Sequence, residues 1–163
     1  YSHCELPADA LAEIASRAPN VKYFKIEGHG SSDKMKELAP QIDNGQKMFG
    51  GGGGITVLTE LRNGAAGLIP GVGFNEVFLD AWDAWARGNH DTAANIIQNA
   101  DRLIKAVSGH GHEYSLHVRK LLMKRAGYIN HADVRRPTGN FHEYDMPTIF
   151  DIVASMSLRI SKN

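Results

Sequence analysis

Short apolar runs and helical repeats alternate along the first half of the chain. Residues 21–27 are rich in β-branched and aromatic side chains, which is typical of a strand, and a glycine follows directly. Shorter apolar runs predict two more strands, at 46–49 and 66–70. Apolar residues at three- and four-residue steps predict helices at 7–17, 31–38, 55–62 and 75–85. This alternation with short connections predicts parallel βα units.

Strand signals end after about residue 80. Helical spacing continues in three segments, at 91–107, 113–126 and 147–160. The second segment is predicted to be strongly buried because it is dense in apolar residues: Leu116, Val118, Leu121, Leu122 and Met123. Three strands cannot close a barrel, and a complete (β/α)8 barrel takes roughly 250 residues. The 163 residues therefore form either a small three-layer α/β protein or a piece of a larger one.

The first predicted strand places a lysine among apolar residues. Lys25 stands between Phe24 and Ile26. Because strand side chains alternate, Tyr23 and Glu27 share the face of Lys25. In a barrel this face points inward, and catalytic groups lie at the C-terminal ends of the strands. An amine kept from water has a lowered pKa and can attack a ketone to form an imine. The alternative is an edge strand on which Lys25 is solvated.

Glu27 follows Lys25 by two residues and projects on the same side. A carboxylate at this point can move protons at the carbon next to an imine. It also favours the charged form of the amine, which opposes nucleophilic attack. The two residues therefore form either an acid–base site or a simple ion pair at the end of the strand.

Five glycines, Gly50–Gly54, lie between a predicted strand and a predicted helix. This arrangement presents backbone N–H groups to an anion, and a substrate carboxylate would suit it. It is not a phosphate-binding P-loop, because no Gly-Lys-Ser/Thr sequence follows. The alternative is a flexible or tightly turned loop.

The histidines of the later helices invite a metal-site interpretation. His112 and His117 are five residues apart, whereas two ligands on one helix face need a four-residue step. We therefore expect no metal site at His110, His112, Glu113 and His117.

Composition narrows the class of protein. Apolar residues make up 42% and charged residues 22%, and 18 basic residues balance 18 acidic ones. Without a basic excess, no nucleic-acid partner is expected. No apolar run reaches the roughly 18 residues of a membrane span. Cys4 is the single cysteine, so no intrachain disulfide is possible and a cytoplasmic setting is expected.

Three motifs together resemble the dihydrodipicolinate synthase/N-acetylneuraminate lyase family. They are Phe24-Lys25-Ile26-Glu27 with the glycine-rich turn after it, the segment 64–71 (GAAGLIPG), and Arg135-Arg136-Pro137 before the last predicted helix. The resemblance covers essentially the whole chain. It implies an α/β fold, the (β/α)8 TIM barrel, from its sixth strand to its C-terminus. Residues 1–88 would be the C-terminal part of the barrel, and residues 89–163 a C-terminal helical region. The family's carboxylate-binding threonines and proton-relay tyrosine would precede residue 1.

Lys-Ile-Glu resembles most the dehydratases of this family that act on 2-keto-3-deoxy sugar acids, notably L-2-keto-3-deoxyarabonate. The resemblance implies that Lys25 forms a Schiff base with a small 2-keto acid and that Glu27 is the acid/base. The substrate pocket would be lined by Gly51, Gly52, Ile69 and Pro70. No cofactor is implied, and a homo-oligomer, dimer or tetramer, is expected. Relatives often carry acidic residues within the glycine run, where this chain has none.

Two further functions stay open at this point. A dihydrodipicolinate synthase or an aldolase would use the same lysine to join or break a carbon–carbon bond. A barrel fragment or scaffold without an active site of its own is the non-catalytic alternative.

Overall fold

The computed structural model describes residues 5–43, 45–135 and 145–161. The chain divides into two compact units, which meet in sequence between Pro70 and Gly71. The predicted division into a barrel part, residues 1–88, and a helical region, residues 89–163, stays a prediction. Cys4, Arg136 and Pro137 lie outside the described residues. No helix in the described ranges is long and apolar enough to cross a membrane.

The first unit contains a parallel sheet with the strand order β1-β2-β3. The strands are β1 (Tyr23–Ile26), β2 (Lys47–Gly50) and β3 (Ala65–Leu68). The helices of this unit are α1 (Ala8–Arg17), α2 (Ser31–Leu38) and α3 (Val57–Arg62), with a 3-10 turn at Ala39–Gln41. The predicted alternation of strands and helices is confirmed, although β1 is shorter than the predicted 21–27 and the other two strands are displaced by one or two residues from the predicted 46–49 and 66–70.

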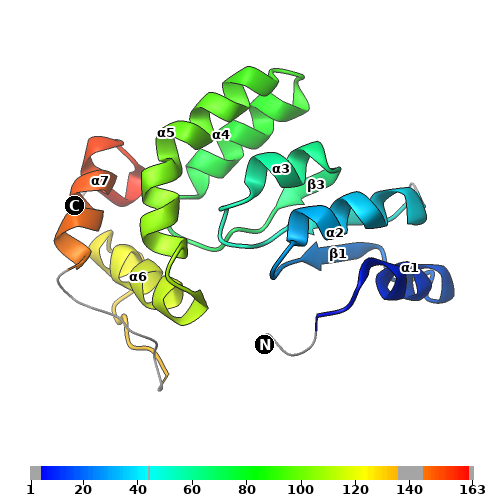
Figure 1. Ribbon diagram of the computed structural model, residues 1–163. Coiled ribbons are helices and arrows are strands. Elements are labelled where there is room, and N and C mark those ends of the chain that lie inside the picture. Colours follow the sequence, from blue (N-terminus) through cyan, green and yellow to red (C-terminus); the bar gives the residue numbers. More distant parts are fainter. Residues whose placement is uncertain (1–4, 44, 136–144, 162–163) are drawn as a thin grey trace. The chain divides into compact units, whose positions relative to one another are not determined.

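One face of the sheet is covered by helices. In Figure 1, α2 and α3 lie against the strands: α2 packs on β1 and β2, α3 packs on β2 and β3, and α1 packs on α2. Strand residues Phe24, Ile26 and Met48 are buried, as are Met35 and Leu38 of α2, the helix that packs on β1 and β2. The opposite face is open in this unit, where Tyr23 is 70% exposed.

The pairing of β2 with β3 contains an irregularity next to Phe49. Met48 pairs with Ala65 and Gly50 pairs with Leu68, so two residues of β3 face one residue of β2. Gly67 lies under the Phe49 ring, since a Cβ on it would be 2.8 Å from Cε1 of Phe49. A side chain at residue 67 would therefore displace the aromatic ring from the open face.

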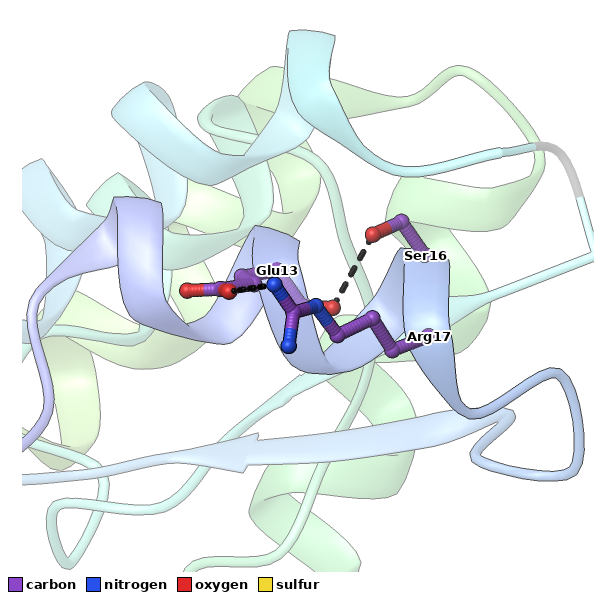
Figure 2. Close-up of polar contacts among 3 residues, drawn as sticks. All are labelled: Glu13, Ser16 and Arg17. Atoms are coloured by element: carbon purple, nitrogen blue, oxygen red, sulfur yellow. Dashed lines mark hydrogen bonds and ion pairs between the residues drawn. The ribbon is translucent and has the colours of Figure 1, made fainter.

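Helix α1 begins after Pro7, which is the N-cap residue rather than the first helical residue. Figure 2 shows its last turn, where Ser16 Oγ donates to the Glu13 carbonyl at 3.0 Å and Arg17 pairs with the Glu13 carboxylate at 2.7 Å. Both charged side chains are mostly exposed, so the ion pair is worth only about 0.3–0.5 kcal/mol. Packing on α2, rather than this pair, holds the helix in place.

The buried Gln46 joins the N-terminal ends of two strands to α1. Its Nε2 donates to the carbonyls of Ala15 and Val21, at 3.0 and 3.1 Å. Its Oε1 accepts a hydrogen bond from the Asp43 backbone N–H at 3.3 Å. These bonds fix the end of the sheet opposite to the one that carries Lys25.

The second unit is helical in its described residues. It contains α4 (Asn75–Ala86), α5 (His90–Ser108), α6 (His112–Arg125), α7 (Asp145–Ser155) and a 3-10 turn at Arg159–Ser161. Helices α4 and α5 run side by side (Figure 1). The predicted helix at 147–160 ends early, because Ser157 takes a left-handed φ of 52°.

The predicted burial of α6 was partly wrong. Val118 and Leu122 are buried, but Leu116 is 46% exposed and Leu121 and Met123 are only half-buried. Consecutive helical residues point in different directions, so three adjacent apolar residues cannot all face the core. The buried face instead contains Tyr114, Ser115 and Arg119 besides Val118 and Leu122.

Arg119 fixes the segment that follows Pro70. Its side chain donates to Ser115 Oγ at 3.1 Å, to Ser108 Oγ at 3.0 Å and to the Val72 carbonyl. The guanidinium also lies 5.0 Å from the centre of the Phe74 ring. Burial lowers the pKa of Arg119 to about 10. The cation is therefore held in a largely dry site by its hydrogen-bond acceptors and the aromatic ring.

We expect Arg119→Ala to lower the free energy of unfolding by about 2–4 kcal/mol, because it removes the hydrogen bonds to Ser115, Ser108 and the Val72 carbonyl and leaves the space of a buried side chain unfilled. Urea unfolding measures this loss. Lys124→Ala, an exposed change on the same helix, is the control and should stay within about 0.5 kcal/mol of the wild type. Equal stability of the two variants would show that Arg119 is not a structural anchor.

Candidate active site

Lys25 and Glu27 lie at the C-terminal end of β1, on the open face of the sheet. Lys25 Nζ and Glu27 Oε1 are 3.0 Å apart. Their side chains are 43% and 51% exposed, so an incoming molecule can reach both groups. The register places Phe49 of β2 opposite Lys25, and the Phe49 ring packs edge-on against Tyr23 at 5.8 Å. An amine and a carboxylate thus lie beside the aromatic pair Tyr23 and Phe49.

Lys25 and Glu27 thus form the ion pair that was one of the two interpretations of their sequence spacing. This geometry also holds the two groups within the distance that proton transfer requires. The catalytic roles of Lys25 and Glu27 therefore stay predictions.

The glycine run passes directly against Glu27. A Cβ on Gly51 would lie 2.2 Å from Glu27 Cγ, so residue 51 must lack a side chain if Glu27 is to keep its place. Gly51 is buried and Gly52 is exposed. Gly53 and Gly54 take φ values of 67° and 91°, which favour glycine. Glycine is therefore required by close approach at Gly51 and favoured by backbone conformation at Gly53 and Gly54.

The end of β3 joins the same region. The Ile69 N–H donates to the Gly50 carbonyl at 2.7 Å, so Ile69 is anchored beside the glycine run. Its side chain is 44% exposed, whereas Pro70 is buried. The structure thus brings Lys25, Glu27 and Gly51 together and links Ile69 to Gly50. The contacts of Gly52, Ile69 and Pro70 with a substrate stay predictions.

A second carboxylate, which the sequence analysis missed, lies behind the glycine run. Glu60 of α3 is 1% exposed. It accepts hydrogen bonds from Thr56 Oγ1 at 2.8 Å and Ser31 Oγ at 3.2 Å. A Cβ on Gly50 would lie 2.0 Å from Glu60 Oε2. Two adjacent glycines therefore each leave room for a carboxylate, Glu60 at Gly50 and Glu27 at Gly51.

Burial raises the pKa of Glu60 above its ordinary value of 4.5. The hydrogen bonds from Thr56 and Ser31 lower this pKa, and the nearby negative charge of Glu27 raises it. Burial is the largest of these effects, so the protonated form of Glu60 is favoured relative to that of an exposed glutamate.

A signal for Glu60 was present in the sequence. Val57 and Leu61 are four residues apart and both are buried, and Glu60 stands three residues after Val57 on the same helix face. A charged residue at an apolar periodic position is the mark of a paired or functional group. The partners could not be found from sequence, because Ser31 is 29 residues away.

Within 5–43, 45–135 and 145–161, no three His, Cys, Asp or Glu residues cluster in a way that could hold a metal ion. The His110 ring packs at 4.9 Å from the ring of Tyr114.

The sequence is similar to that of a characterised dehydratase. The chain is 31% identical over 138 residues to the L-2-keto-3-deoxyarabonate dehydratase of Azospirillum brasilense, over 84% of this chain and 44% of that enzyme. No family model matches the chain.

Solved structures of dihydrodipicolinate synthases share the fold. The enzyme of Aquifex aeolicus superimposes with a TM-score of 0.80 at 18% identity, over 98% of this chain and 53% of its own. The enzyme of Rhodopseudomonas palustris gives 0.78 at 19% identity, over 91% and 50%. The 4-hydroxy-tetrahydrodipicolinate synthase of Methylacidiphilum fumariolicum SolV gives 0.78 at 16% identity, over 97% and 50%.

The predicted resemblance to the dihydrodipicolinate synthase/N-acetylneuraminate lyase family is confirmed. The chain spans about half the length of the relatives it matches. Its fold is that of the dihydrodipicolinate synthases, a TIM-barrel family, and the three parallel strands of the first unit fit a part of such a barrel.

We expect Glu60→Gln to be more stable than the wild type at pH 7. Because the pKa of Glu60 is raised on folding, its stabilising contribution is complete below pH 4.5 and is lost as the pH rises through the folded-state pKa. The neutral amide keeps an acceptor for Ser31 and Thr56 but carries no buried charge.

Urea unfolding at pH 4 and pH 7 measures the effect. The advantage of Glu60→Gln should shrink towards pH 4, where the wild-type carboxyl is also neutral. Glu37→Gln, on the exposed side of α2, is the control and should show a smaller change with pH. A Glu60→Gln variant that is less stable than the wild type at pH 7 would mean that the ionised form is the preferred one.

Proposed function

We propose that the chain supplies the sixth to eighth strands of a (β/α)8 barrel whose enzyme forms a Schiff base on Lys25. The single observation that carries this proposal is the contact of Lys25 with Glu27 at the C-terminal end of β1, on the face of the sheet that the helices leave open. Active sites of barrel enzymes lie at this end of the strands. The five remaining strands would cover the open face and complete the pocket.

The reaction follows from the two groups. Lys25 Nζ attacks the C2 ketone of a 2-keto acid, and water leaves to give the imine. The imine acidifies the proton on C3, which Glu27 accepts. Protonated Glu27 then returns this proton to the C4 hydroxyl, which leaves as water while a C3–C4 double bond forms. Hydrolysis of the imine releases the dehydrated 2-keto acid and frees Lys25.

The substrate class rests on the related dehydratase. Its name assigns it L-2-keto-3-deoxyarabonate, and the alignment covers 84% of this chain. We therefore propose a 2-keto-3-deoxy sugar acid as the substrate, with Gly51, Gly52, Ile69 and Pro70 lining its pocket. The backbone N–H groups of the glycine run would face the substrate's polar groups. No cofactor is needed for this chemistry.

Synthase or aldolase chemistry is the second candidate, because solved synthases share the fold. It would use the same imine but join or break a carbon–carbon bond. We also propose a homo-oligomer, as the family resemblance implies, and a cytoplasmic setting, as the single cysteine suggests. A non-catalytic fragment would form no imine at all.

We expect the intact protein to form a reducible imine at Lys25. Borohydride added with pyruvate should leave an adduct, which mass spectrometry should locate on the peptide that contains Lys25. Lys25→Arg should abolish the adduct. Lys22→Arg, an exposed lysine beside the same strand, is the matched control and should keep it. An adduct on another residue, or none, would reject the proposed chemistry.

We expect Glu27→Gln to keep imine formation and lose turnover, because its proposed role begins after the imine is formed. General acid–base groups contribute about 10²–10⁴-fold in rate. The dehydration rate is measured beside the yield of borohydride trapping, with Glu37→Gln as control. Turnover near the wild-type rate would leave Glu27 as a structural partner of Lys25.

A further inference from the structure

We infer that Glu60 is a positioning residue, which holds the glycine run so that Glu27 and Lys25 meet. This inference deepens the proposed function and rests on it. Glu60 does not touch the open face, since it is 1% exposed and belongs to the helix layer. It can therefore act only through the groups that it holds.

Glu60 connects the two loops that follow β1 and β2. Ser31 is the first residue of α2, directly after the loop Gly28–Gly30, and it donates to Glu60 Oε1 at 3.2 Å. Thr56 is the N-cap residue of α3, two residues after the glycine run ends at Gly54, and it donates to the same oxygen at 2.8 Å. One carboxylate oxygen thus ties the ends of both loops. Neither loop can shift without breaking a buried hydrogen bond.

The second oxygen of Glu60 is close to the backbone of β2. It fills the space where a side chain of Gly50 would be, 2.0 Å from that Cβ position. On the next residue, Glu27 fills the corresponding space of Gly51, with its Cγ 2.2 Å from that Cβ position. The Gly50–Gly51 backbone is therefore held between two carboxylates. A movement of Glu60 would alter the surface on which Glu27 rests.

The position of Glu27 matters for the proposed reaction. Its carboxylate is 3.0 Å from Lys25 Nζ, and it would act on the carbon next to an imine at that nitrogen. A misplacement of about 1 Å can cost about 10²-fold in rate. Imine formation depends on the Lys25 amine and precedes the proton transfer that is proposed for Glu27. Loss of Glu60 should therefore reduce turnover more than imine formation.

The test compares four variants of the intact protein: Glu60→Gln, Glu60→Ala, Thr56→Val and Glu37→Gln. For each, kcat, KM and the yield of borohydride-trapped pyruvate at Lys25 are measured, together with hydrogen–deuterium exchange of the amides of residues 51–56. We expect Glu60→Ala to lower kcat about 10–100-fold, with an unchanged trapping yield and faster exchange. Glu60→Gln should restore kcat, because its amide oxygen accepts the same two hydrogen bonds. Thr56→Val should fall between them, and Glu37→Gln should match the wild type.

Three results would overturn the inference. An unchanged kcat in a folded Glu60→Ala variant would leave Glu60 a structural residue only. A Glu60→Gln variant as slow as Glu60→Ala would mean that hydrogen-bond acceptance is not what matters. If Glu60→Ala does not fold, an unchanged kcat in the double variant Ser31→Ala/Thr56→Val would reject the inference. A wild-type protein that traps no pyruvate would overturn the proposed function and this inference with it, and trapping distinguishes that case from the other three.

Discussion

The burial of one sheet face against α2 and α3 determines where the candidate groups point. Phe24 and Ile26 must face the helices to be removed from water, and strand alternation then sends Lys25 to the other face. The same constraint sets β2, where Met48 is buried and Phe49 faces the open side opposite Lys25. The chemistry of the open face thus depends on a hydrophobic contact on the covered face. A shift of one residue in register would reverse both faces together.

The open face explains why the three-stranded sheet can hold the candidate groups Lys25 and Glu27 together and still leave the proposed site incomplete. The Lys25 side chain is 43% exposed, so water reaches its amine on the open face of this unit. Further barrel strands over this face would exclude water from both groups and add the low dielectric that nucleophilic lysines need. The covering part of the barrel is therefore a requirement of the proposed chemistry and not only of stability.

Local pattern was sufficient for the elements and for the pair on β1, but not for the groups that support it. Alternation within 23–27 placed Lys25 and Glu27 on one face, and the structure puts them in contact. Periodicity failed in α6, where three adjacent apolar residues suggested burial that helical geometry does not allow, and Arg119 stands on the buried face instead. Glu60 was missed for another reason. Its hydrogen-bond partners are Ser31 and Thr56, which stand at the ends of two different loops. Ser31 is 29 residues away in the sequence, and such a pairing is a property of the tertiary fold.

The glycine run shows how one sequence feature can meet separate demands at successive positions. Gly50 leaves space for the buried carboxylate of Glu60, which belongs to the helix layer. Gly51 leaves space for the exposed carboxylate of Glu27 on the open face. Gly53 and Gly54 take positive φ values, which glycine adopts readily, on the way to Thr56 and the start of α3. Composition alone left a flexible or tightly turned loop as one alternative, but the hydrogen bond from Thr56 to Glu60 and the bond from Ile69 to Gly50 hold this segment at both ends. The glycines therefore permit close packing, and at Gly51 this packing leaves room for the Glu27 carboxylate that pairs with Lys25.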